Sequence, residues 1–222
     1  MIMKQFTQLY ALVFAASMAI VRPVVADAKI WPTDSICEDF DYMIKCLVET
    51  HPDPFSAWGG ESSFYASVGK FRESLLADSI GTEEELASRL GVFLSHLHDG
   101  HTYINQSFNG LSLRFLPLKF RQSADGLIVR ETTEPYANLL GMKLEKVENV
   151  PISELKRRIS EFVTVENESG EMLALRYYLN TEPYLRKLFP AFSGDSFKIE
   201  LSDGNDTNQT IELPLIGQNE LT

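Results

Sequence analysis

The feature that most constrains the fold is a change of hydrophobic period at Asp99-Gly100. Up to Leu97 the apolar residues recur at helical spacing, and from Thr102 onward they alternate as they do in strands. An Asp-Gly pair at such a junction favours a tight turn. The sequence therefore predicts a helical unit, a turn with His101 at its mouth, and then a strand-rich unit.

The segment before the turn predicts three helices. Apolar stripes cover residues 36–50, 64–77 and 86–97. Ser35-x-x-Glu38 and Thr82-x-x-Glu85 match the capping box that opens a helix. His51-Pro52-Asp53-Pro54 ends the first helix, because a proline disfavours helical backbone at the residue before it.

The segment after the turn predicts strands with a few helices. The expected strands are 103–108, 111–120, 127–131, 143–147, 197–201 and 210–213, and the expected helices are 153–162 and 172–188, with a break near Pro183. We therefore expect an α+β protein: a three-helix N-terminal domain over residues 29–101, then a mixed strand and helix module over residues 102–222.

The first 28 residues are typical of a signal peptide. Lys4 precedes an apolar run over residues 9–21, and the small residues Ala26 and Ala28 follow. The run is shorter than the ~20 apolar residues of a membrane span. We expect export to the periplasm, the cell envelope or the medium, with no membrane attachment after cleavage. An uncleaved anchor is the alternative.

The formal net charge of −11 argues against a nucleic-acid or anionic-membrane partner. The two cysteines, Cys37 and Cys46, fall nine positions apart in one predicted helix. Their Cα atoms would then lie ~13 Å apart, which is beyond disulfide reach. Apolar packing is the expected role of both thiols.

Several stretches together resemble one enzyme family. His51-Pro52-Asp53-Pro54-Phe55 looks like the entry of the tail-specific (C-terminal-processing) serine peptidases, and Leu97-His98-Asp99-Gly100-His101-Thr102 resembles an Asp-Gly-His-Thr turn of their tricorn-like branch. Residues 134–137, Gly141 and residues 144–152 look like the middle of a PDZ-like module.

The resemblance implies that the chain is the N-terminal and PDZ-like portion of an exported serine endopeptidase that cleaves peptides or protein tails. In that family the nucleophilic serine belongs to a later α/β domain, which this segment lacks. His101 would be the general base for that serine, with Asp99, Gly100 and Thr102 supporting the turn. In other members a lysine is the base. The implied partners are the substrate and the missing catalytic domain, and no cofactor or metal is implied.

Three alternatives remain open. His101 could be a structural histidine that caps a helix or is held by hydrogen bonds. His96-x-His98-Asp99-x-His101 nearly matches the zinc signature of metallo-β-lactamase-like hydrolases, with His51 as the one further histidine. The chain could also be a non-catalytic, exported peptide-binding or scaffold protein.

Neither of two known serine motifs identifies a nucleophile in this sequence. Gly194-Asp195-Ser196 resembles an esterase nucleophile block but has no histidine after it, and the sequence contains no Gly-x-Ser-x-Gly elbow. We expect Ser196 to lead into a strand.

Overall fold

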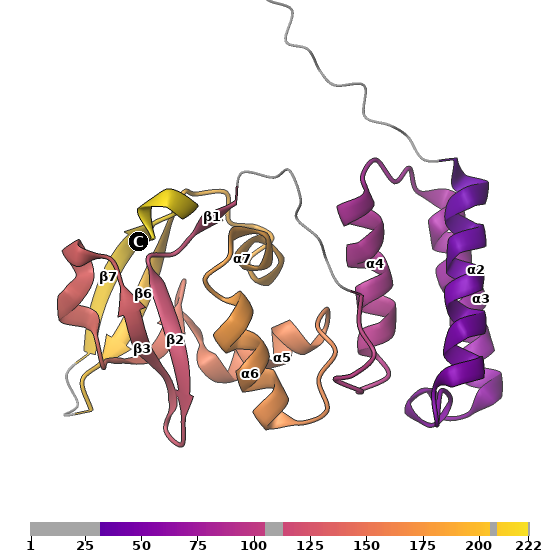
Figure 1. Cartoon of the computed structure of the whole chain (residues 1–222), viewed down its shortest axis with the longest axis horizontal. Helices are drawn as coiled ribbons and strands as arrows, with labels where there is room; N and C mark the ends of the chain where they lie inside the picture. The colour runs from indigo at the N-terminus through magenta and orange to yellow at the C-terminus, as the bar shows by residue number, and fades with distance from the viewer. Residues whose placement is uncertain (1–31, 105–112, 205–207, 222) are drawn as a thin grey trace, which may run out of the picture.

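The computed structural model describes residues 32–104, 113–204 and 208–221, and it is a mixed α+β protein, as predicted. A helical unit and a sheet-containing unit lie side by side (Figure 1). Each has its own apolar core, one drawn from residues 36–97 and the other from residues 116–215. The domain boundary after His101 stays a prediction, and the expected signal peptide lies outside the described residues.

The helical unit contains α2 (Thr33–Thr50), α3 (Glu61–Ala77) and α4 (Glu83–Ser95), with the 3-10 turn η1 (Ser56–Trp58) between the first two. Aromatic packing at its centre joins all three helices. The fully buried ring of Phe40 contacts Phe71 at 4.9 Å and Phe93 at 5.4 Å between ring centroids. The burial of these rings stabilises the unit that carries the Asp-Gly turn.

Of the two helix starts predicted from capping boxes, one is confirmed and one is wrong. The Thr82 side chain accepts a hydrogen bond from the Glu85 backbone N–H at 3.1 Å, so this cap is confirmed. The capping box at Ser35 is wrong, because α2 begins at Thr33 with Pro32 at the cap position and no side-chain cap. Pro32 has a ψ of 126°, outside the helical range, so the helix begins directly after it at Thr33, two residues before Ser35.

The second unit is built on an antiparallel sheet with the strand order β2-β3-β4-β6-β7. Its strands are β2 (Leu118–Ser123), β3 (Gly126–Thr132), β4 (Lys143–Val147), β6 (Ser196–Ser202) and β7 (Asn208–Pro214), and the short β5 (Val150–Pro151) pairs with β4. A separate two-stranded pair joins β1 (Arg114–Phe115) to β8 (Ile216–Gly217). The predicted strands at 127–131, 143–147, 197–201 and 210–213 are confirmed.

Two strand predictions need correction. Residues 103 and 104 belong to no strand, and the rest of the predicted 103–108 strand lies outside the described residues. The single strand expected over 111–120 is split between β1 and β2 at Leu116-Pro117. Pro117 has no backbone N–H to donate to a neighbouring strand, so the ladder is interrupted there.

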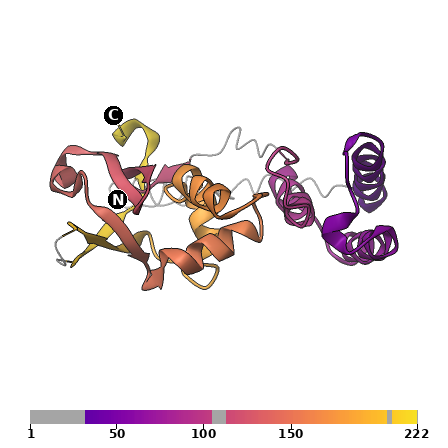
Figure 2. The same ribbon diagram turned by 90° about the horizontal axis from the view of Figure 1, so that it is seen from below.

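Three helices lie between the sheet and α4, as both ribbon views show (Figures 1 and 2). They are α5 (Ile152–Ser160), α6 (Glu168–Tyr178) and α7 (Glu182–Leu188), and the remaining 3-10 turns are η2 (Glu134–Leu139) and η3 (Gln218–Glu220). The predicted break near Pro183 is confirmed. It falls just before this proline, which occupies the first turn of α7.

A buried serine connects the two units. Ser95, at the end of α4 and only 3% exposed, shares its hydroxyl hydrogen between the carbonyls of Val92 at 2.8 Å and Glu161 at 3.0 Å. Glu161 follows α5, so this contact fixes the end of α4 against the second unit. No helix among the described residues has the length and apolarity to cross a membrane.

Candidate functional site

The turn after α4 forms where the sequence predicts it. The Thr102 backbone N–H donates to the Asp99 carbonyl at 3.1 Å, which closes a four-residue turn. The left-handed residue is His98, with φ of 51°, rather than a glycine. Asn, Asp and His tolerate this conformation better than most side chains. His98 therefore ends the helical path and sends the chain into the turn.

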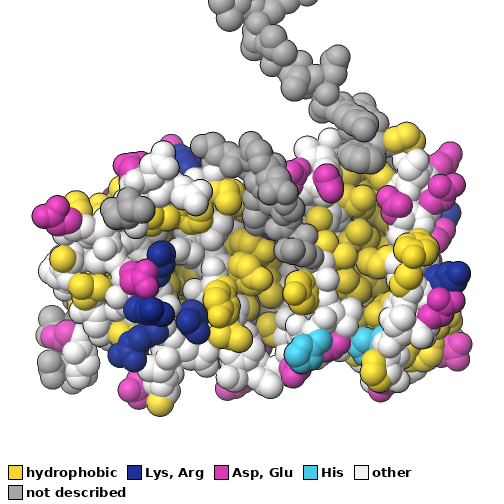
Figure 3. Space-filling model, in the orientation of Figure 1, with side chains coloured by type: hydrophobic (Ala, Val, Ile, Leu, Met, Phe, Trp, Pro, Cys, Tyr) yellow, Lys and Arg dark blue, Asp and Glu magenta, His cyan; other side chains and the backbone are white. Residues whose placement is uncertain are grey.

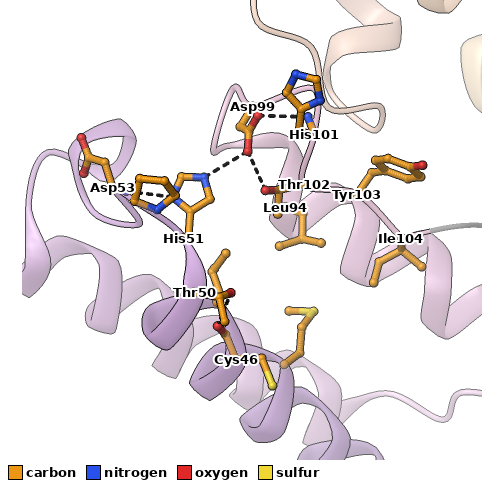
Figure 4. Close-up of a pocket in the computed structure, with 13 residues that line it drawn as sticks. Cys46, Thr50, His51, Asp53, Leu94, Asp99, His101, Thr102, Tyr103 and Ile104 are labelled. Carbon is orange, nitrogen blue, oxygen red and sulfur yellow. Dashed lines mark hydrogen bonds and ion pairs between the residues drawn. The ribbon is translucent and has the colours of Figure 1, made fainter.

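The Asp99 carboxylate organises this turn. One oxygen, Oδ2, accepts from the Thr102 hydroxyl at 2.6 Å and contacts His51 Nε2 at 3.1 Å, and the other, Oδ1, accepts from the His101 backbone N–H at 2.9 Å (Figure 4). These bonds, led by those from Thr102 and His101, lower the pKa of Asp99 below its ordinary value. Asp99 is therefore an ionised acceptor at neutral pH.

His51 reaches the turn from the far end of α2. It is the residue at the C-terminal cap of that helix, and its side chain is 12% exposed. Its other ring nitrogen, Nδ1, accepts a hydrogen bond from the Asp53 backbone N–H at 3.1 Å. The Asp53 carboxylate in turn accepts from the backbone of Ser56 at 3.1 Å, so the loop that holds the His51 ring is itself ordered.

His101 has an open imidazole. Its side chain is 92% exposed and lines the open pocket beside the turn (Figure 4). Nε2 lies 3.8 Å from the carboxylate of Glu166, which belongs to the second unit and is itself half exposed. That separation is longer than a hydrogen bond, and an exposed pair of this kind contributes little energy. The ring is therefore free to meet a group that approaches from outside.

A wide, open pocket of about 650 Å³ lies between α2 and the segment after α4. Its polar lining includes His51, Asp99, His101 and Thr102. Its other lining residues include Met43, Cys46, Leu47, Leu94 and Ile104. Figure 3 shows apolar side chains gathered both between α2 and α4 and where the two units meet, with histidine side chains at the lower rim. An apolar surface thus adjoins the polar turn.

The remaining histidines do not join the turn. His96 stacks on Trp58 with 5.1 Å between ring centroids, and His98 is exposed. Within the part of the chain that the structure describes, no cluster of three or more His, Cys, Asp or Glu side chains could hold a metal ion. Cys37 and Cys46 are both free thiols.

The esterase-like motif is part of the scaffold. Ser196 begins β6, as expected, and the Asp195 carboxylate lies 3.0 Å from the guanidinium of Arg114 and 3.5 Å from that of Arg186. Asp195 therefore has a structural role in pairing with two arginines, and the motif does not require a nucleophilic serine.

The fold is similar to that of solved structures of CPAF. Mature CPAF superposes with a TM-score of 0.60 at 15% identity, covering 83% of this chain and 35% of that chain. Mature CPAF complexed with lactacystin gives 0.57 at 14% identity over 83% and 35%. A photosystem II D1 C-terminal processing protease gives a TM-score of only 0.32 at 14% identity, over 82% and 44% of the two chains, which supports no comparison.

The CPAF likeness shows a shared fold, and the chain spans about a third of the length of CPAF. No protein-family model matches the sequence, and no curated protein matches it.

The sequence located the turn but missed the side chain that supports it from outside. Asp99, Gly100, His101 and Thr102 are together in one turn, as predicted. His51 was noted within a helix-ending motif, within the stretch that resembles the entry of the peptidase family, and as a possible zinc ligand, but not as a partner of Asp99. Its pairing with Asp99 spans 48 positions, and no local spacing rule connects residues so far apart. The nearness of Glu166 to His101 was also unforeseen.

Proposed function

We propose that this chain is the N-terminal and PDZ-like portion of an exported serine endopeptidase, and that His101 is the general base for a serine outside the segment. The similarity to CPAF supports a protease-like fragment at the level of the fold. The assignment to the tricorn-like branch rests on the residue resemblance of the Asp-Gly-His-Thr turn.

The observation that carries the proposal is the exposure of the His101 ring. A structural histidine, which caps a helix or is held by hydrogen bonds, would have its ring nitrogens bonded to other groups of the protein. Instead, 92% of the side chain is exposed, while the backbone N–H of the same residue is fixed by Asp99 at 2.9 Å. A fixed backbone with an open imidazole suits a group that must receive a proton from an incoming partner.

The chemistry follows from that placement. A serine hydroxyl attacks a peptide carbonyl only when a base within ~2.6–3.2 Å removes its proton. In the proposed reaction the proton passes from the serine Oγ to a ring nitrogen of His101, and the new C–O bond gives a tetrahedral intermediate. The imidazolium then protonates the leaving amine as the peptide C–N bond breaks. Water hydrolyses the acyl group by the same steps in reverse order.

The pocket beside the turn supports the proposal that the substrate is a peptide. Its apolar lining lies next to His101, so a side chain near the cleaved bond would have an apolar surface to bury. Burial of one large apolar side chain is worth about 1.5–3 kcal/mol.

The test is to read the coding DNA beyond Thr222 and to assay the encoded product. We expect an α/β domain with a serine that a fluorophosphonate probe labels covalently. A stop codon directly after Thr222, with no labelling of the purified protein, would refute the proposal and favour the alternative of a non-catalytic, exported peptide-binding or scaffold protein.

A further inference from the structure

We infer that His51 is a positioning residue for the turn that presents His101, and that it acts through Asp99 rather than as a base itself. The inference deepens the proposed function and depends on it for its catalytic consequence. Its structural consequence, the ordering of the His101 backbone, can be measured without any activity.

The hydrogen-bond network assigns the tautomer of His51. Nδ1 accepts from the Asp53 backbone N–H at 3.1 Å, so Nδ1 carries no hydrogen. Nε2 lies 3.1 Å from Asp99, whose ionised carboxylate can only accept. The hydrogen of the neutral ring must therefore be on Nε2, and His51 donates it to Asp99.

This assignment separates His51 from a catalytic histidine. A histidine beside an aspartate suggests a catalytic dyad, but in such a dyad one ring nitrogen bonds the carboxylate and the other remains free to take a proton. Both nitrogens of His51 are occupied, and its side chain is only 12% exposed. His51 has no site to receive a proton from a serine unless the bond to the Asp53 backbone breaks.

The direction of the bonds shows what His51 does instead. Asp99 accepts two hydrogen bonds from within its own turn, from the Thr102 hydroxyl and from the His101 backbone N–H. The bond from His51 comes from the end of α2, 48 positions earlier. It connects the turn to a helix packed in the core of the helical unit. The bond from His51 thereby restrains rotation of the Asp99 carboxylate. The carboxylate in turn holds the backbone N–H of His101.

Two substitutions separate positioning from proton transfer. In His51→Gln the amide N–H lies near the place of Nε2, so it can still donate to Asp99, but it cannot act as a base. His51→Ala removes the donor. His98→Asn is the matched control, because His98 is exposed in the same segment and asparagine tolerates its left-handed backbone.

The first measurement is hydrogen exchange of the His101 backbone amide in this chain, followed by NMR. Without the His51 donor the Asp99 carboxylate can rotate away from the His101 N–H, so protection should fall about tenfold in His51→Ala. His51→Gln and His98→Asn should keep protection near that of the wild type. Unchanged protection in His51→Ala would overturn the inference.

The second measurement is peptide cleavage by the longer polypeptide with its serine domain. Misplacement of a catalytic group by about 1 Å can cost ~100-fold, so we expect kcat to fall by about 10- to 100-fold in His51→Ala with KM little changed. His51→Gln should restore most of kcat and keep the pH profile of the wild type. Loss of activity in His51→Gln, with protection of the His101 amide intact, would show that His51 takes part chemically and would overturn the inference.

The two proposals fail in different ways. If His101→Gln leaves cleavage unchanged, the proposed function fails, but the exchange measurement still decides whether His51 orders the turn. If His101→Gln abolishes cleavage while His51→Ala changes neither kcat nor exchange, the proposed function stands and the positioning role is wrong.

Discussion

The side chains of His51 and Asp99 meet 3.1 Å apart, although 48 positions separate them in the sequence. His51 ends α2, and Asp99 opens the turn that follows α4. The contact joins the end of the first helix of the unit to the turn that follows its third helix. The candidate catalytic turn is therefore hydrogen-bonded to the residue that ends a core helix.

Asp99→Asn tests the central acceptor of the turn. The amide keeps one oxygen acceptor but turns an N–H₂ group toward a donor, so at least one of the three hydrogen bonds is lost. We expect the free energy of unfolding in urea to fall by about 1–3 kcal/mol at pH 7. Asp125→Asn, at the exposed tip of the β2–β3 hairpin, is the matched control and should change stability little.

The effect of Asp99→Asn should also depend on pH. The pKa of Asp99 is lower in the folded protein than its ordinary value of 3.8, first because of the Thr102 hydroxyl and then the His101 amide. Its stabilising effect is fully present above that ordinary value and is lost as the pH falls through the folded pKa. A difference between wild type and variant that stayed constant from pH 7 to acid would contradict this account.

Ser95→Ala tests the connection between the two units. The hydroxyl hydrogen that Ser95 shares with the Val92 and Glu161 carbonyls is lost, while the helix itself tolerates alanine well. We expect a loss of about 1 kcal/mol in thermal or urea unfolding. Ser160→Ala removes a hydroxyl that bonds only within its own helix at 2.8 Å and lies on the surface, so it should cost less. Equal losses would show that the Glu161 contact adds nothing.

Lys187→Met tests a half-buried cation. Burial lowers the pKa of Lys187 from its ordinary 10.5 to about 8. Folding therefore carries an electrostatic cost when the amine is charged, and the stability of the wild type should rise as the pH increases from about 8 to 10.5. The variant should lose this part of the pH dependence and be at least as stable at pH 7. A variant less stable than the wild type at pH 7 would contradict it.

Phe197→Ala tests the core of the second unit. The ring is fully buried between the sheet and Phe189 and Phe192, with ring centroids 6.0 and 4.8 Å away. Its truncation should cost about 3–5 kcal/mol. Because the helical unit has its own apolar core, far-UV circular dichroism should retain helical signal after the sheet unit has melted. Loss of all structure in one transition would show that the two cores are fully coupled.

The sequence predicted most of the fold because its signals are local. The Thr82 cap, the helix break before Pro183 and the strand expected over residues 127–131 each depend on neighbouring residues. Of the candidate site, only the turn from Asp99 to Thr102 was predicted, because only this part is formed by residues that are neighbours in the sequence. The ends of α2 and α4 are brought together by packing of rings such as Phe40 and Phe93, and residue spacing carries no information on that contact.

The most direct measurement of the central claim is the steady-state cleavage rate of the longer polypeptide with His101→Gln. Glutamine keeps the size of the side chain and the backbone bond to Asp99 but cannot accept a proton at neutral pH. Loss of a general base costs about 10²–10⁴-fold, so kcat should fall by that factor while His98→Asn stays near the wild type. A kcat in His101→Gln equal to that of the wild type would contradict the assignment of His101 as the base.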